Sequence, residues 1–420
     1  MLFNSFEFFA FFVTFLVVFF SLPPRTQPFV LLIGSYIFYM GWRPSYALLL
    51  ALTTVVDYTT GLMMARARTE LRRKTAMIIA LSINLGVLGT VKYLDFMIAN
   101  VIGLVGIFGY QLPDYALGII LPVGISFYTF QSIGYTLDVY NRRIEAERNF
   151  ITYAQYVSFF PQLVAGPIER APHMLPQFRR THALSFENIP PGLWFIGYGL
   201  FKKMCVADAL APIVNGIFAN PQNYSGSYNL LAGLAFIVQV YCDFSGYSDI
   251  AVGVARIMGF DLMINFRQPF FSTSISDLWR RWNISLISWF RDYLYFPLGG
   301  SKGSEIKTTR NIMIVWLASG LWHGAAWTYI AWGAYYGFWL IVERHVTRKL
   351  QPEKWLGTKL SCVLGGIWAI ACFTVGEIIF RAPSFTKALI MLQSFGDWGP
   401  LSYGTFKVLG LPSFELAMLC

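Results

Sequence analysis

The 420-residue chain has few charged residues: Asp, Glu, Lys and Arg together make up 13% of it, about half the share that is usual in soluble proteins. Residues of the set AVILMFWYC make up 56%, and the 36 glycines raise the apolar share to about 65%, against about 45–50% in soluble domains. This composition excludes a soluble globule, and it excludes disorder, which needs low hydrophobicity. Long unbroken apolar runs favour a helical membrane protein over a transmembrane barrel.

Cysteine is scarce and scattered. The five cysteines, at positions 205, 242, 362, 372 and 420, form no CxxC pair, so neither a disulfide framework nor a zinc site is indicated. The chain also lacks the GxSxG, P-loop, dinucleotide-binding and HExxH motifs, which leaves a serine hydrolase or an ATPase without support. No basic stretch has a nucleic-acid-binding pattern. We therefore expect no metal, no tightly bound cofactor and no nucleic-acid partner.

Apolar runs that fit a hydrocarbon core of about 30 Å occur at 5–22, 27–42, 45–65, 76–94, 116–139, 150–166, 189–219, 228–258, 311–343, 360–380 and 402–419. Pro122 and Gly124 interrupt one of these runs, and Pro161, Gly166 and Pro167 interrupt another. Irregular backbone at membrane depth is tolerated only inside protein or beside a water-filled cavity. The interruptions therefore indicate re-entrant segments and an internal cavity.

The first apolar run has no basic segment before it and no small-residue cleavage pattern, so we interpret it as a retained span and not as a signal peptide. No soluble domain, linker or convincing internal repeat is visible. We therefore expect one integral membrane domain over residues 1–420.

Basic residues indicate the orientation of the chain. Lys and Arg number 32 against 22 Asp and Glu, and such an excess usually marks cytoplasmic loops. Residues 66–74 include five basic side chains and one acid, Glu70, so this loop should be cytoplasmic. Three spans precede it, which predicts a periplasmic amino terminus. The basic stretches 141–148 and 168–182 should lie on the cytoplasmic side as well.

The segment 274–298, SISDLWRRWNISLISWFRDYLYFPL, does not fit the pattern of a span. It contains too many charges for a helix that faces lipid: Arg280, Arg281, Arg291 and Asp292. Its apolar residues recur at helical spacing, at Leu278, Trp282, Leu286, Trp289 and Tyr293, which predicts an amphipathic interfacial helix. Asn283 would stand in the middle of this helix. Its amide could orient a histidine or donate to an oxyanion, or it could be a surface residue.

Four histidines are present, and one of them stands apart. His173, His182 and His345 lie in polar surroundings typical of solvated or interfacial histidines, whereas His323 lies in SGLWHGAAWTY, within the apolar run 311–343. An ionisable residue at membrane depth is costly and indicates function, and a neutral imidazole suits proton abstraction. Gly320 and Gly324 should leave room beside it for a substrate. A buried structural histidine is the alternative.

A second polar group, YCDFSGYSD, lies within another apolar run. Asp243, Ser245 and Asp249 belong to it, and carboxylates at that depth must face protein, water or cations. We expect a structural role for them, in ion pairs with Arg280, Arg281 or Arg291. The break in FPQLVAGPI, residues 160–168, either exposes backbone donors to a ligand or forms a tight re-entrant turn.

Four segments together resemble the membrane-bound O-acyltransferase family: FPQLVAGPI, YCDFSGYSDIAVG, NFRQPFFSTSISDLWRRWNISLISWFRDYLYFPLGG and GLWHGAAWTYIAWG. The resemblance runs from near the start of the chain to about residue 395 and is strongest to the branch of the bacterial alginate O-acetyltransferase membrane subunit. It implies an all-α polytopic membrane protein, with about 11 transmembrane or re-entrant helices around a central tunnel. The family's near-invariant histidine falls on His323. Its second active-site position falls on Asn283, where alginate-type members usually carry histidine.

The resemblance also implies a reaction. An acyl thioester, acetyl-CoA in this branch, would enter from the cytoplasm, and His323 would take the proton of an acceptor hydroxyl while Asn283 holds the geometry or stabilises the oxyanion. The acyl group would cross a bacterial inner membrane to a periplasmic acetyltransferase partner that modifies a polysaccharide. The residues expected to bind substrate are Trp279, Arg280, Arg281, Trp282, Arg291, Asp292, Trp322, Gly324, Gly166 and Pro167.

Two alternatives remain at this point. Within the family, a teichoic-acid D-alanyl transferase would use an acyl carrier protein in place of CoA. Outside it, a transporter or polysaccharide channel would also contain broken helices and charges at membrane depth. The sequence ends at Cys420 in an apolar segment, where relatives generally continue for one or more spans, so either this member is short or further carboxy-terminal spans exist.

Overall fold

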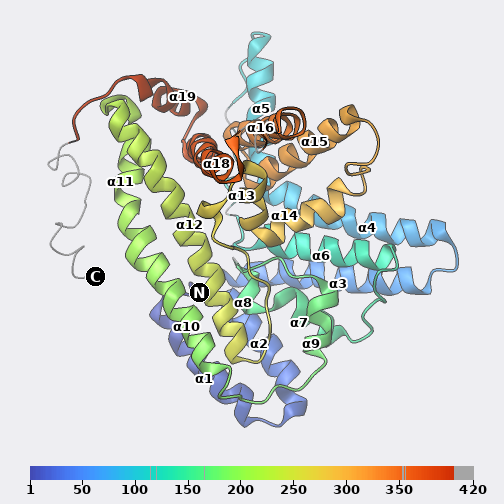
Figure 1. Cartoon of the computed structure of the whole chain (residues 1–420). Helices are drawn as coiled ribbons and strands as arrows, with labels where there is room; N and C mark the ends of the chain where they lie inside the picture. Colours follow the sequence, from blue (N-terminus) through green and yellow to red (C-terminus); the bar gives the residue numbers. More distant parts are fainter. Residues whose placement is uncertain (114, 120, 165, 352–353, 355, 402–420) are drawn as a thin grey trace. The chain divides into compact units, whose positions relative to one another are not determined.

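The computed structural model describes residues 1–113, 115–119, 121–164, 166–351, 354 and 356–401. The described part of the chain is mainly helical and contains no strand (Figure 1), which confirms the all-α prediction. It divides into two compact units, one made of Met1–Ile196 with Ala251–Met263 and the other of Gly197–Ile250 with Ile264–Cys420. The expected span 402–419 lies outside the described residues.

Unit 1 is built from the amino-terminal helices. These are α1 (Phe6–Ser21), α2 (Gln27–Met40), α3 (Pro44–Arg66), α4 (Glu70–Leu88), α5 (Leu94–Ile107), α6 (Ile125–Tyr140), α7 (Phe150–Ser158), α8 (Phe160–Leu163), α9 (Ala171–Phe178) and most of α10 (Ile189–Leu200). A π-helical turn, Gly89–Tyr93, joins α4 to α5. Local capping fixes two starts: Thr69 accepts a hydrogen bond from the Arg72 N–H, and Asn149 accepts from the first turn of α7.

The predicted interruptions in unit 1 are present. The expected span 116–139 is wrong in its first part, because α6 begins only at Ile125, after Gly124 at φ 81°. A Cβ at Gly124 would lie 2.1 Å from the Leu163 carbonyl oxygen, so only glycine allows this approach. The run 150–166 is also broken, into α7 and α8, and residues 166–170 are not helical.

Ion pairs connect the three basic stretches of unit 1. Arg142 lies 2.5 Å from Glu70, and Arg179 lies 2.5 Å from Glu147. These pairs are partly exposed and contribute little stability. They link the stretches 66–74, 141–148 and 168–182 to one another, and the side of the membrane on which these stretches lie stays a prediction.

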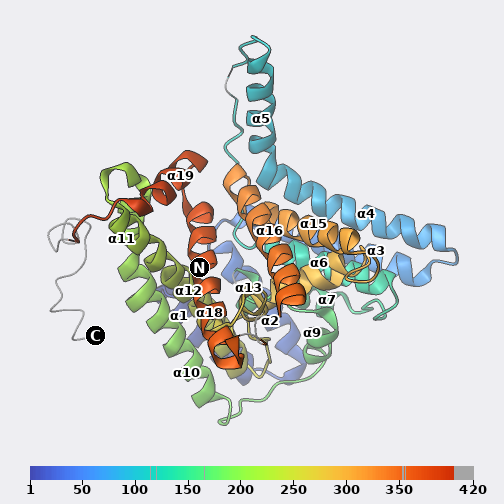
Figure 2. The same cartoon turned by 45° about the horizontal axis from the view of Figure 1, so that its top comes forward.

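Unit 2 contains the remaining helices. These are α11 (Asp208–Ala219), most of α12 (Gly226–Ile257), α13 (Ile275–Arg281), α14 (Ile284–Phe290), α15 (Glu305–His323), α16 (Trp327–Leu350), α18 (Thr358–Arg381) and α19 (Phe385–Gln393). Two π-helical turns, Phe201–Ala207 and Arg291–Tyr295, interrupt the helical backbone. In both views α15 and α16 lie side by side (Figures 1 and 2).

The apolar run 311–343 is therefore two helices and not one span. Its break lies at residues 324–326, where the backbone is extended. Glycines let α15 and α16 approach closely. A Cβ at Gly320 would lie 2.3 Å from the carbonyl oxygen of Tyr329, and a Cβ at Gly333 would lie 2.3 Å from the carbonyl oxygen of Trp316. His323 consequently stands at the carboxy-terminal end of α15, where the sequence predicted the middle of one continuous run.

Four described helical segments are long and apolar enough to cross a membrane: Pro44–Arg66, Glu70–Ile107, Gly226–Ile257 and Thr358–Arg381. The shorter helix Phe6–Ser21 is also apolar. These segments support a multi-pass membrane protein. The breaks described above mean that several of the expected runs are not single spans.

Candidate active site

The block around Asn283 is broken where one continuous amphipathic helix was predicted. α13 ends at Arg281 and α14 begins at Ile284, and Asn283 between them has φ 41°, a left-handed conformation that Asn tolerates better than most residues. The break is stabilised by a segment distant in sequence. The Arg267 N–H donates to the Arg281 carbonyl (2.9 Å), and the Ile284 N–H donates to the Asn265 carbonyl (2.9 Å).

Asn265 holds this break with its side chain as well. Its Oδ1 accepts from the Ser285 N–H at 3.2 Å, and its Nδ2 donates to Ser248 Oγ at 3.1 Å. Sequence reasoning missed Asn265, because nothing local to residue 265 indicates that it pairs with residue 285.

Asn283 is buried in this break. It is 3% exposed, so the alternative of a surface residue is wrong. Its Oδ1 has no hydrogen-bond partner among the described residues, and a buried acceptor without a partner is costly. The amide oxygen therefore has unused hydrogen-bonding capacity inside this break.

Glu343 of α16 fixes the start of α13. Its two carboxylate oxygens accept from the backbone N–H groups of Ile275 (2.7 Å) and Ser276 (3.0 Å), where the helix dipole favours a negative charge. In the sequence, Glu343 stands out as an acid at the end of an apolar run. Nothing in the sequence indicates that its partner is the start of α13.

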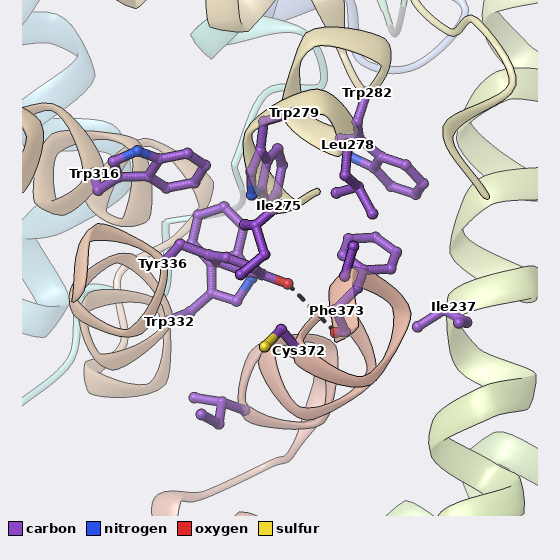
Figure 3. Packing of buried hydrophobic residues seen from close by; sticks show 12 residues of the cluster. Ile237, Ile275, Leu278, Trp279, Trp282, Trp316, Trp332, Tyr336, Cys372 and Phe373 are labelled. Atoms are coloured by element: carbon purple, nitrogen blue, oxygen red, sulfur yellow. Dashed lines mark hydrogen bonds between the residues drawn. The ribbon is translucent and has the colours of Figure 1, made fainter. Parts of the chain in front are cut away.

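A cluster of aromatic rings connects α13 to the last helices of the chain. Trp279 contacts Trp316 and Tyr336, both with ring centroids at 4.7 Å, and contacts Trp332 at 5.6 Å. Trp282 packs on Phe373 at 4.9 Å. Figure 3 shows these rings gathered between α13 and the helices that carry Trp316, Trp332 and Phe373. Two of the predicted substrate-binding residues, Trp279 and Trp282, thus lie in a packed cluster.

His323 lies at the edge of this aromatic cluster. Its ring is 4.9 Å from the ring of Trp332, 5.2 Å from that of Phe380 and 4.9 Å from that of the adjacent Trp322, always edge to face. The residue is half-buried. Asn283 directly follows Trp282, which belongs to the same cluster. Both predicted catalytic residues therefore lie in unit 2 and next to residues of this aromatic cluster.

The predicted opening beside Gly320 and Gly324 is absent. A Cβ at Gly324 would lie 2.1 Å from Cε2 of Tyr329, so the space beside this glycine is filled by an aromatic ring of α16. The two glycines allow close helix packing, and that expectation of a substrate path is wrong.

A cavity of about 990 Å³ lies in unit 2. Basic residues line it, among them Arg280, Arg291, Arg344 and Lys354, and so do Trp316 and Ser319 of α15. Ser319 stands one helical turn before His323, is 3% exposed, and its Oγ has no partner among the described residues. The cavity therefore combines a lining of four basic residues and one acid, Glu343, with an unsatisfied hydroxyl close in sequence to the candidate base.

The charged residues of the Trp–Arg block pair locally. Arg281 Nε lies 3.0 Å from Asp277, Arg291 Nε lies 2.8 Å from Asp292, and Arg280 donates to Ser276 Oγ at 3.3 Å. The predicted pairing of these arginines with the YCDFSGYSD carboxylates is thus wrong.

Those carboxylates pair with lysines instead. Asp249 pairs with Lys202, and Asp243 lies 2.6 Å from Lys203, which also pairs with Asp208 at 2.8 Å. Both lysines lie in the π-helical turn Phe201–Ala207. The structural ion-pair role is therefore right, and the partners were not foreseen because the lysines stand in another apolar run. Ser245, which lies between the two aspartates in the sequence, is also buried.

Two predicted site residues lie outside this cluster. Gly166 and Pro167 belong to unit 1, where a Cβ at Gly166 would lie 2.4 Å from Gln162 Cα; this supports the tight-turn alternative. His173 also belongs to unit 1 and binds Glu169 through Nδ1 at 2.8 Å, a hydrogen bond that raises the pKa of this exposed histidine.

No group of three metal-binding side chains occurs in the part of the chain that the structure describes.

Comparison with known proteins identifies the chain's relatives. The profile of the membrane-bound O-acyltransferase family matches residues 142–375, a range that contains Asn283 and His323. The probable alginate O-acetylase AlgI of Pseudomonas aeruginosa is 41% identical over 400 residues, covering 93% of this chain and 74% of the relative. AlgI of Azotobacter vinelandii is 40% identical, covering 93% of this chain and 77% of the relative.

A third relative has a different named substrate. The peptidoglycan O-acetyltransferase of Helicobacter pylori is 33% identical over 392 residues, covering 86% of this chain and 72% of the relative. The match to the family profile and the extent of these similarities agree with the helical fold and with the motifs around His323. The chain therefore belongs to the membrane-bound O-acyltransferase family and is a membrane-bound O-acetyltransferase.

Proposed function

We propose that this enzyme takes an acetyl group from acetyl-CoA at the cytoplasmic face and passes it across the membrane for O-acetylation of a polysaccharide outside the cytoplasm. The observation that carries the proposal is the cavity of about 990 Å³, whose lining includes Arg280 and Arg291 and reaches Ser319, one turn before His323. Cationic side chains suit the phosphates of a CoA thioester.

In this mechanism His323 is the general base. Its imidazole takes the proton of the acceptor hydroxyl, and the hydroxyl oxygen attacks the carbonyl carbon of the thioester. The tetrahedral oxyanion then collapses, the C–S bond breaks, and the CoA thiolate recovers the proton from the imidazolium. The products are an acetyl ester and CoA thiol.

Asn283 orients the reacting groups. Its buried Oδ1, which has no partner among the described side chains, accepts a hydrogen bond from the attacking hydroxyl, and its N–H donors are available to the oxyanion. Asparagine has no ionisable proton, so a mechanism with two histidine bases does not apply to this chain.

The acceptor is proposed from the names of the relatives, which are an alginate O-acetylase and a peptidoglycan O-acetyltransferase. Both polymers lie outside the cytoplasm. We therefore propose a polysaccharide acceptor, reached through a periplasmic acetyltransferase partner, and a location in the bacterial inner membrane.

A comparison of donors tests this proposal. Purified enzyme in lipid nanodiscs should release CoA from acetyl-CoA in the presence of alginate oligosaccharides and periplasmic extract, and should not accept a D-alanylated carrier protein. Turnover of the carrier alone would support the D-alanyl transferase alternative, and transport without release of CoA would support a transporter.

The cationic lining of the cavity should control affinity for the donor. Arg280→Ala should raise the KM for acetyl-CoA by about 10–100-fold with little change in kcat, because a charge-assisted hydrogen bond contributes about 1.5–3 kcal/mol and is formed equally in the ground and transition states. Arg310→Ala, an exposed arginine of unit 2 outside the cavity lining, is the matched control. Equal KM values for the two variants would exclude this cavity as the donor site.

The proposal also predicts the orientation of the protein in the membrane. Leu71, 76% exposed in the first turn of α4, should be cytoplasmic, and Arg43, between α2 and α3, should be periplasmic. In a cysteine-free background, Arg43→Cys should react with an impermeant maleimide in cells with a permeabilised outer membrane, and Leu71→Cys should react only after lysis. The reverse pattern would place the donor side in the periplasm.

A further inference from the structure

Glu377 is a buried acid for which the mechanism above has no use. It lies near the end of α18, an apolar helix long enough to span a membrane, and is 4% exposed. An ionisable side chain in such a helix is costly and is retained for a specific partner or function. Its surroundings therefore indicate what it does.

Glu377 binds the indole of Trp332. Its Oε1 accepts a hydrogen bond from Trp332 Nε1 at 3.1 Å, and Trp332 is 2% exposed. The indole N–H is the only polar atom of a tryptophan side chain, so this bond sets the rotation of the ring within its apolar site.

Trp332 in turn packs against the candidate base. The Trp332 and His323 rings lie 4.9 Å apart at 74°. Phe380, which follows Glu377 by one turn of α18, contacts His323 at 5.2 Å and Trp332 at 5.6 Å. The helix α18 thus reaches His323 in two ways, directly through Phe380 and through Trp332 by the bond to Glu377.

The contact between α16 and α18 fixes the position of the carboxyl group. Tyr336 donates to the Phe373 carbonyl at 3.3 Å (dashed line in Figure 3), and Tyr335 donates to the Cys372 carbonyl at 2.9 Å. A Cβ at Gly376 would lie 2.3 Å from the Tyr336 hydroxyl oxygen, so only glycine permits this approach beside Glu377.

We infer that Glu377 is a positioning residue for acyl transfer: it holds the Trp332 ring that fixes the imidazole of His323. This inference rests on the proposed role of His323 as base. The acceptor oxygen of Glu377 performs this function, and its negative charge is not required. A proton relay through the carboxylate would instead require the ionisable group.

Variants of the hydrogen bond between Trp332 and Glu377 distinguish a positioning role of Glu377 from a proton relay. Glu377→Gln keeps an acceptor oxygen and should retain a kcat close to wild type. Glu377→Leu and Trp332→Phe each remove one side of the bond and should lower kcat by up to about 10²-fold, the cost of a small misplacement of a catalytic group, while the KM for acetyl-CoA stays nearly unchanged. The double variant should be no slower than either single one, because both remove the same interaction.

Tyr335→Phe is the matched control. It also removes a hydrogen bond from α16 to α18, but Tyr335 makes no ring contact with His323 in the described structure. This variant should keep wild-type kcat. An equal loss in Tyr335→Phe and Glu377→Leu would reduce Glu377 to a general contact between helices and overturn the inference.

A second readout does not depend on activity. The rate at which diethyl pyrocarbonate modifies His323, followed by peptide mass spectrometry, should rise in Glu377→Leu and stay at the wild-type value in Glu377→Gln and Tyr335→Phe. Unchanged labelling in a monodisperse Glu377→Leu protein, or a Glu377→Gln protein as slow as Glu377→Leu, would overturn the inference. A wild-type enzyme that does not use acetyl-CoA would refute the proposed function, and the labelling would still decide the role of Glu377.

Discussion

His323→Ala should produce a folded membrane protein that no longer transfers acetyl groups. The expected loss is about 10²–10⁴-fold in kcat, the usual contribution of a general base. The reason is the position of the ring, half-buried at the end of α15 and held between Trp332 and Phe380. Release of CoA by the purified variant measures the effect.

Two further variants make this result specific. His323→Gln fills more of the same space with a polar group that cannot act as a base, so it should be as slow as the alanine variant while packing is better preserved. His345→Ala removes a half-buried histidine of α16 that binds the Ile341 carbonyl and should keep wild-type activity. Normal turnover in His323→Gln would make His323 a structural residue.

Asn283→Ala should lower kcat by about 10²–10³-fold, the usual cost of losing one positioned polar group at the reacting centre. Its amide is buried, and the Oδ1 has no partner among the described residues, so the loss should fall on the reaction more than on the fold. Asn283→His should retain partial activity, because the resemblance to the alginate-type branch implies that histidine can serve at this position. Steady-state kinetics of the three proteins make the comparison.

The backbone at Asn283 needs its own control. Its φ of 41° is strained for alanine, which costs roughly 1–2 kcal/mol, but not for glycine. Asn283→Gly should therefore be as slow as Asn283→Ala while its thermal stability stays closer to wild type. A glycine variant with normal kcat would show that the loss in alanine came from the backbone and not from the amide.

Much of the fold could be predicted because it depends on local apolar patterning. The runs around α3, α12 and α18 contain their own signal, and the structure has an apolar helix at each. The errors occur where a distant segment decides the backbone. The predicted helix through Asn283 fails because Asn265 and Arg267 bond to residues 281–285. The run 311–343 splits because α15 and α16 pack at glycine contacts.

In the candidate site, too, features that depend on local sequence could be predicted, and features that depend on distant segments could not. The sequence singles out His323 as a candidate, because a lone histidine in an apolar run is costly without a function. The partners of Asp243 and Asp249 could not, since Lys202 and Lys203 lie in a separate apolar run. Ser319 and Glu377 are single polar residues in apolar helices, a signal present in the sequence, but their relation to His323 depends on how α15, α16 and α18 pack.

The central claim is that one enzyme uses His323 to move an acetyl group, and not acetyl-CoA, across the membrane. Its most direct test is a reconstituted vesicle with [¹⁴C]acetyl-CoA inside and alginate oligosaccharides with periplasmic extract outside. Labelled acetyl ester should appear outside with an equal amount of CoA thiol retained inside, and both should be absent with His323→Gln. Intact labelled acetyl-CoA outside, or labelled ester formed equally by His323→Gln, would contradict it.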